Sequence, residues 1–171
     1  MNFDDGVPPD ALDLGALELP DLEEASGELH RRIGVALRRI GELRADAALP
    51  GERSARWHVA SLVVMFELAA ASFAVIAATG AAVVLPRLDH HPAAIAATMY
   101  AAPTLQALLG RLEQDRRQLA ALARSLETHL DERHATAFGE LSLRALLAEV
   151  AVAEGARCAL LVEHAADRAT A

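Results

Sequence analysis

The chain has 171 residues, of which 53% are apolar, and a formal net charge of −8. This length suits one domain, and the abundance of Ala and Leu favours helices. The excess of acid lies in residues 1–28, which hold nine Asp and Glu and no Arg or Lys, while the rest of the chain holds 15 acids and 16 Arg. Such a balance lacks the basic surface of a nucleic-acid-binding protein, so we expect no nucleic-acid partner.

Residues 1–20 are the first predicted region, an acidic arm with three prolines among scattered Leu. This composition predicts a mobile arm, although its Leu residues would also suit a short docking element. No secretory signal peptide is expected, because the arm is acidic and the first strongly apolar stretch begins far downstream. The remaining residues, 21–171, are predicted to form a single helical domain.

The first helix is predicted over about residues 21–46, after Pro20. One face is marked by apolar residues spaced by three, four and seven positions: Leu22, Leu29, Ile33, Leu37, Ile40 and Leu43. This spacing is typical of an amphipathic helix that buries one side. The segment Leu49-Pro50-Gly51 separates it from the next helix.

The second predicted helix, about residues 54–85, is the most apolar part of the chain. Between Val59 and Leu85 the only charge is Glu67, and residues 68–85 form an uncharged run of 18. A run of this length is a candidate membrane span. A stripe of small residues recurs every four positions and would let another helix approach closely, namely Ala70, Ala74, Ala78 and Ala82.

The third predicted helix covers about residues 92–134, with a break near 103 because Pro103 interrupts it. Its first part, residues 93–110, is a second uncharged run, and its later part shows a near-heptad spacing of Leu that is broken at Asp115 and Arg116. A turn near residues 135–136 leads to the last predicted helix, about 138–168. The fold class is therefore an all-α antiparallel bundle of four to five helices around one very apolar central helix, with no strand.

The central helix must be buried, either in protein or in lipid. Trp57, close to Arg53 and Arg56, resembles an interfacial anchor, and the Arg-rich segments 29–58 and 111–133 flank the two apolar runs. This charge distribution favours a membrane hairpin in a bacterial inner membrane, with both termini cytoplasmic. Three features count against a membrane hairpin: the weak apolarity of Ala, the proline at Pro103 and the charge of Glu67. The alternative is a cytoplasmic soluble bundle.

Motifs for catalysis and metal binding are missing from the sequence. There is no pair of Glu-x-x-His motifs, no His-Glu-x-x-His, no Gly-x-Ser-x-Gly and no Gly-rich phosphate loop. Asp131-x-x-His134 and His90-His91 are interpreted as solvated polar segments, and the one cysteine, Cys158, as an inert buried thiol. We therefore expect no enzyme, no catalytic residue, no metal and no cofactor.

Glu67 is the main candidate functional residue, with Trp57 and the Ala stripe beside it. A carboxylate in so apolar a helix would line a pore, pair with an Arg across a helix seam, or reach solvent at the rim of the apolar stretch. The three possibilities stay open at this point.

The last helix contains the segments Phe138-Gly-Glu-Leu, Leu-Leu-Ala-Glu and Ala-Leu-Leu-Val-Glu. With this ending, the order of elements over about residues 21–168 resembles the SLATT-type domains of bacterial conflict systems. Those domains combine an amphipathic helix, a two-transmembrane hairpin with a short turn, and C-terminal helices. This sequence departs from them at Cys158, where an aromatic residue is expected. The resemblance implies a membrane-perturbing effector held in check by a partner, and it implies no catalytic residue.

The leading hypothesis is a non-enzymatic helical protein with a membrane hairpin that acts through self-association or a helical protein partner, with the lipid bilayer as a further partner. One alternative is a soluble four-helix-bundle scaffold or accessory subunit. Another is a helical carrier of an apolar ligand in an Ala-lined core.

Overall fold

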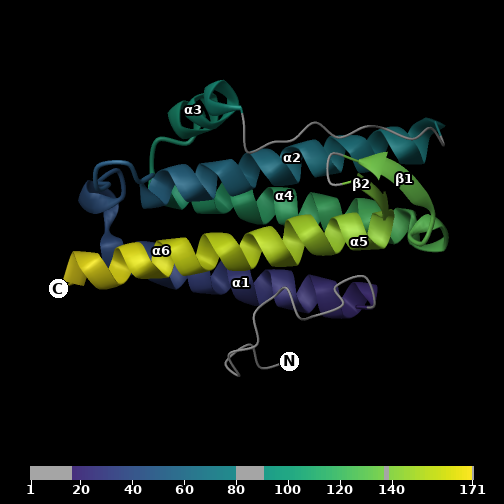
Figure 1. Cartoon of the computed structure of the whole chain (residues 1–171), viewed down its shortest axis with the longest axis horizontal. Helices are drawn as coiled ribbons and strands as arrows, with labels where there is room; N and C mark the ends of the chain where they lie inside the picture. The colour runs from purple at the N-terminus through teal and green to yellow at the C-terminus, as the bar shows by residue number, and fades with distance from the viewer. Residues whose placement is uncertain (1–16, 80–90, 137–138, 171) are drawn as a thin grey trace.

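The computed structural model describes residues 17–79, 91–136 and 139–170, which form a helical bundle (Figure 1). The long helices are α1 (Leu19–Ile40), α2 (Ala55–Thr79), α4 (Leu105–Ser125) and α6 (Glu154–Thr170). Shorter pieces connect them: η4 (Glu42–Arg44), α3 (Pro92–Ala101), η5 (Glu127–His129), strands β1 (Arg133–Thr136) and β2 (Gly139–Ser142), α5 (Leu143–Ala148) and the π-helical η6 (Glu149–Ala153). The predicted all-α class is confirmed.

The bundle consists of two pairs of helices (Figure 1). The two helices of each pair run in the same direction, and the two pairs run in opposite directions. In the first pair, α1 and α6 lie side by side, joined by Arg32 to Glu163 at 2.8 Å and by Arg39 to Asp167 at 2.9 Å. In the second pair, α2 packs along α4, and the chain returns through α3 to the beginning of α2 before α4 starts. The predicted antiparallel bundle around one apolar helix is therefore confirmed.

Helix α2 forms the centre of the core because most of its side chains are apolar and only Arg56 and Glu67 are charged. Of the residues in its most apolar stretch, 67% are buried, and Val59, Val63 and Phe73 are completely buried. Among the described helices, α2 alone is long and apolar enough to cross a membrane. The last part of the predicted helix, residues 80–85, lies outside the described residues.

The second apolar run is divided at Pro103 into α3 and α4, whose axes are bent by 115°. The Thr104 hydroxyl accepts a hydrogen bond from the backbone N–H of Ala107 at 3.1 Å and caps α4. The predicted break near 103 is confirmed. Residues 93–110 do not form one straight helix, because proline lacks the backbone donor that the preceding turn needs.

Arg56 joins three segments at the beginning of α2. Its guanidinium, of which only 7% is exposed, donates to the Pro103 carbonyl at 2.6 Å and to the Glu42 carboxylate at 2.5 Å. Glu42 also accepts the backbone N–H of Leu105 at 2.9 Å. These bonds fix η4, α2 and the first turn of α4 against one another. The predicted membrane anchor thus has one of its Arg residues tied into the protein.

Several predicted boundaries are wrong. The first helix ends at Ile40 instead of 46, because Gly41 adopts a positive φ of 76° that stops the helix. Helix α4 ends at Ser125 instead of 134, and the last helix begins at Leu143, where the Ser142 hydroxyl caps the backbone N–H of Ala145 at 3.1 Å.

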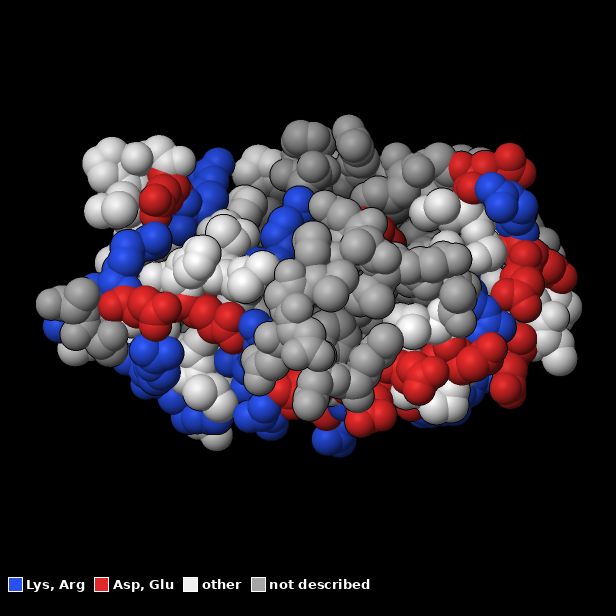
Figure 2. Space-filling view, turned by 60° about the horizontal axis from the view of Figure 1, so that its bottom comes forward, with Lys and Arg blue, Asp and Glu red and all other residues white. Residues whose placement is uncertain are grey.

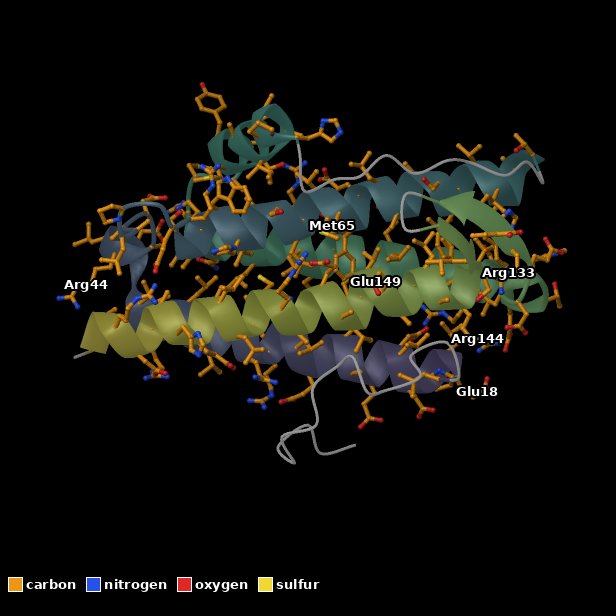
Figure 3. The ribbon with its side chains drawn as sticks, viewed as in Figure 1. Glu18, Arg44, Met65, Arg133, Arg144 and Glu149 are labelled. Atoms are coloured by element: carbon orange, nitrogen blue, oxygen red, sulfur yellow. The ribbon has the colours of Figure 1, made fainter. Side chains whose placement is uncertain are left out.

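The prediction that the chain has no strand is also wrong. Strands β1 and β2 pair antiparallel, with Arg133 opposite Ser142 and Thr136 opposite Gly139. Each strand has four residues, too few for an alternating pattern to stand out in the sequence. Close to this hairpin, Arg144 contacts Asp131 at 2.9 Å and Glu18 at 3.3 Å, and it joins the hairpin end of the bundle to the start of α1 (Figure 3).

Candidate functional site

Glu67 lies on the seam between α2 and α4. Its carboxylate accepts a hydrogen bond at 2.6 Å from Nε of Arg111, and about a third of each side chain is exposed. The structure combines two of the three positions considered for this carboxylate, an ion pair with an Arg across a helix seam and a place that solvent reaches. The pair sits at the rim of the core, where solvent still reaches both charges.

Asp115, one turn after Arg111 on α4, lies deeper in the same seam. It is 8% exposed, and its Oδ2 atom has no hydrogen-bond partner in the part of the chain that the structure describes. Burial raises the pKa of Asp115 to about 6, the negative charge of Glu67 adds to the rise, and Arg111 opposes it. Two carboxylates, of Glu67 and Asp115, and the Arg111 guanidinium therefore form a charged cluster on the α2–α4 seam.

Sequence reasoning did not select Asp115, although the sequence held a signal for it. The near-heptad spacing of Leu along α4 is broken at this residue, and the structure shows that Asp115 occupies a buried position there. A carboxylate at a core-facing position is a recognised mark of a functional group.

On another side of α4, Glu113 is held by two arginines and lies near the half-buried ring of His30. Its carboxylate accepts from Nε of Arg116 at 2.8 Å and from Nε of Arg117 at 2.6 Å, and Nε2 of His30 lies 3.8 Å away. The hydrogen bonds from Arg116 dominate, and together these contacts lower the pKa of Glu113 to about 2. This cluster ties α1 to α4.

Replacing Glu113 by glutamine is expected to lower the free energy of unfolding by about 2 kcal/mol at neutral pH, after allowance for solvent at this partly exposed site. Because the pKa is depressed in the folded state, the loss is present above about pH 4.5 and disappears as the pH falls towards about 2. Urea denaturation across this range measures it. The same change at exposed Glu127 should have no such effect, and a constant loss at every pH would contradict the prediction.

The Ala stripe is divided between the core and the surface. Ala70 is 3% exposed and packs in the core, whereas Ala74 and Ala78 are exposed. Ala82 lies outside the described residues. The stripe is therefore not one contact line inside the bundle, because in this part of α2 Phe73 and Ile76 face the core and the alanines lie on the exposed side.

Trp57 is half-buried at the beginning of α2. The Arg53 guanidinium lies over its ring at 5.0 Å from the ring centre, and the His58 ring meets it edge-on at 5.5 Å. Beside these residues, a groove of about 260 Å³ runs between α2 and α6. Trp57 is thus placed against protein on one side and an open groove on the other.

The remaining candidate groups offer no reactive arrangement within the described ranges. No set of three His, Cys, Asp or Glu side chains there could hold a metal ion. Cys158 is buried, and burial raises the pKa of its thiol to about 12, so the expectation of an inert thiol fits. His91 is exposed, and His90 lies outside the described residues.

His134 corrects one interpretation of the sequence. It was expected at a solvated helix end, but it lies in strand β1 and is 8% exposed. Its partner in the sequence motif, Asp131, instead pairs with Arg144 at 2.9 Å. In the hairpin that sequence reasoning missed, His134 lies opposite Leu141.

Charged side chains are interleaved on the face that Figure 2 shows, with blue and red groups alternating outside the grey area. On this face the visible basic groups do not gather into a single patch.

Comparisons with known proteins assign nothing to these residues. No protein-family model matches the chain, and no curated protein and no solved structure matches it at a significant level. What the chain does is therefore inferred from the contacts, burial and charges of its own residues.

Proposed function

We propose that this protein is a non-enzymatic helical-bundle module that works by self-association. The observation that carries the proposal is two uncharged, exposed apolar stretches, one in the last third of α2 and one on α3, here together called the apolar ridge. It consists of Ala71, Ala74, Val75 and Ala78 of α2 and Ala93, Ala96, Ala97 and Tyr100 of α3, all of them exposed.

The side chains of the ridge are apolar and exposed, which is unfavourable in water for a chain that stays a monomer. Tyr100 is 89% exposed and Val75 is 43% exposed. No Lys, Arg, Asp or Glu occurs in residues 68–79 or 91–110, so the described part of this surface has no charge to keep it in water. Exposed apolar patches of this kind mark interaction sites. In Figure 1, α3 lies above the beginning of α2, and the last third of α2 lies at the other end of the bundle.

A second copy of the chain fits this surface best. Alanine side chains let two helices approach closely, so identical ridges can pack against each other across a two-fold axis. Tyr100 would supply a large aromatic contact at such an interface, and aromatic residues are enriched there. The burial of α2 by its own chain, together with the internal bonds of Arg56, supports a bundle that stays folded when it associates.

The test is sedimentation equilibrium of the full chain without detergent. We expect a concentration-dependent dimer, and Tyr100→Asp should weaken it by at least about tenfold, because a charge would be buried in the interface. Val35→Asp is the matched control, since Val35 is 40% exposed on α1, at the opposite edge of the bundle (Figure 1). A monomer at all concentrations, or equal effects of the two variants, would overturn the proposal.

Membrane association is the second candidate, favoured by the length and apolarity of α2 and by the broken apolar pair α3–α4. It would use the same uncharged segments, and the layout resemblance to SLATT-type domains stays a prediction. Flotation with phosphatidylcholine vesicles separates the candidates. Wild type that floats, with loss of flotation in Tyr100→Asp but not in Val35→Asp, would favour the membrane. Wild type that stays in the aqueous fraction would favour self-association.

A further inference from the structure

Two carboxylates share one guanidinium on the seam between α2 and α4, which lie side by side in Figure 1. Arg111 of α4 is already bonded to Glu67 of α2, at 2.6 Å from its Nε atom. Asp115 lies four residues after Arg111, so the two side chains are neighbours, one turn apart on the same face of the helix. Among the described residues, the cation that acts on Asp115 is therefore the one that Glu67 already holds.

The two carboxylates differ in how much water reaches them. About a third of the Glu67 side chain is exposed, so water can solvate its charge when Arg111 leaves it. Asp115 is 8% exposed, and its Oδ2 atom has no hydrogen-bond partner in the described ranges. A buried charge without partners is far more costly than a buried neutral carboxyl group, so an ionised Asp115 needs Arg111 more than Glu67 does.

We propose that Asp115 is a proton-controlled switch for the ion pair between Arg111 and Glu67. When Asp115 carries a proton, Arg111 reaches across the seam and ties α4 to α2 through Glu67. When Asp115 releases its proton to solvent, the Arg111 guanidinium turns along α4 to the new carboxylate, and Glu67 is left to water. Burial raises the pKa of Asp115 to about 6, so the exchange falls between about pH 5 and about pH 7.

Glu67 and Arg111 are the charged groups that act on Asp115 within the described residues. Neither α3 nor the part of α2 after Glu67 carries an Asp, Glu, Arg or Lys. The charged groups where α1 meets α4 face one another instead: Glu23 pairs with Arg124, and His30 and Arg116 face Glu113. The switch does not rest on self-association, because all of its groups belong to one bundle.

Double-mutant cycles in the full chain, at about pH 5 and about pH 7.5, test the switch. Each cycle measures how far the effect of two substitutions on the unfolding equilibrium constant departs from the product of their single effects. The cycle of Glu67→Gln with Arg111→Gln is expected to give a coupling of about threefold at the lower pH, as for a partly exposed ion pair, and almost none at the higher pH. The cycle of Asp115→Asn with Arg111→Gln should show the opposite dependence on pH.

Two controls isolate the role of Asp115. In the Asp115→Asn background, the coupling between Glu67 and Arg111 should be the same at both pH values, because position 115 no longer titrates. The ion pair of Glu23 with Arg124 also joins a Glu and an Arg across two helices, and its coupling should not change with pH. A Glu67–Arg111 coupling that is equal at both pH values in the wild-type background, or that falls with pH in Asp115→Asn as well, would overturn the proposal.

Discussion

Replacing Phe73 by alanine is expected to lower the free energy of unfolding by about 4 kcal/mol. Phe73 has no exposed surface and is the largest completely buried side chain of α2. Its loss removes the transfer free energy of the ring and leaves a cavity, which a close-packed core closes only in part. Urea denaturation followed by circular dichroism at neutral pH measures the change.

The matched control is Val75→Ala, two residues further along the same helix. Val75 is 43% exposed, so its loss is expected to cost less than about 1 kcal/mol. The contrast distinguishes a core helix from a helix surrounded by lipid, in which both side chains would meet similar apolar surroundings. Equal costs at the two positions, measured without detergent, would contradict the packing of α2 described here.

The second large effect is expected at Asp115. Because the folded state raises its pKa to about 6, protonated Asp115 favours the fold, and this contribution is lost as the pH rises from about 4 through 6. A rise of about two pKa units corresponds to about 3 kcal/mol, which solvent at the rim of the seam reduces to about 2 kcal/mol. Asp115→Asn should therefore be more stable than wild type by about 2 kcal/mol at about pH 7.5, and equal to it at about pH 4.

The measurement is the difference in unfolding free energy between wild type and Asp115→Asn across that pH range. Glu67→Gln should move the pH-dependent step to lower pH, because the charge of Glu67 is one of the causes of the raised pKa. Glu24→Gln, at an exposed position on α1, should give a flat difference. A variant at Asp115 that is less stable than wild type at neutral pH would show that the ionised carboxylate supports the fold.

The structure also changes the meaning of Glu67. Sequence patterning singled it out as the only charge in the central apolar segment, and a pore or a membrane rim explained it as well as an ion pair did. In the fold, Arg111 comes from 44 residues further along the chain to pair with it. Asp115 then becomes the more unusual group, because it is buried beside a pair that is already formed.

The sequence by itself determined that the chain is helical, that α2 is its most apolar long helix, and that Pro103 divides the following segment. These are local properties, set by residue propensity, apolar periodicity and the missing donor of proline. Local signals also existed for two features that were missed, the helix stop at Gly41 and the cap at Ser142.

Only the tertiary structure decided which side of each helix is buried and which charges meet. Four features depend on the packing of segments that are distant in sequence. They are the pairing of Glu67 with Arg111, the burial of Asp115, the split of the Ala stripe between Ala70 and Ala78, and the groove beside Trp57. Periodicity describes one helix at a time. An evenly apolar helix such as α2 shows no preferred face, so its partners, and with them its exposed edge, were fixed only when α3, α4 and α6 packed against it.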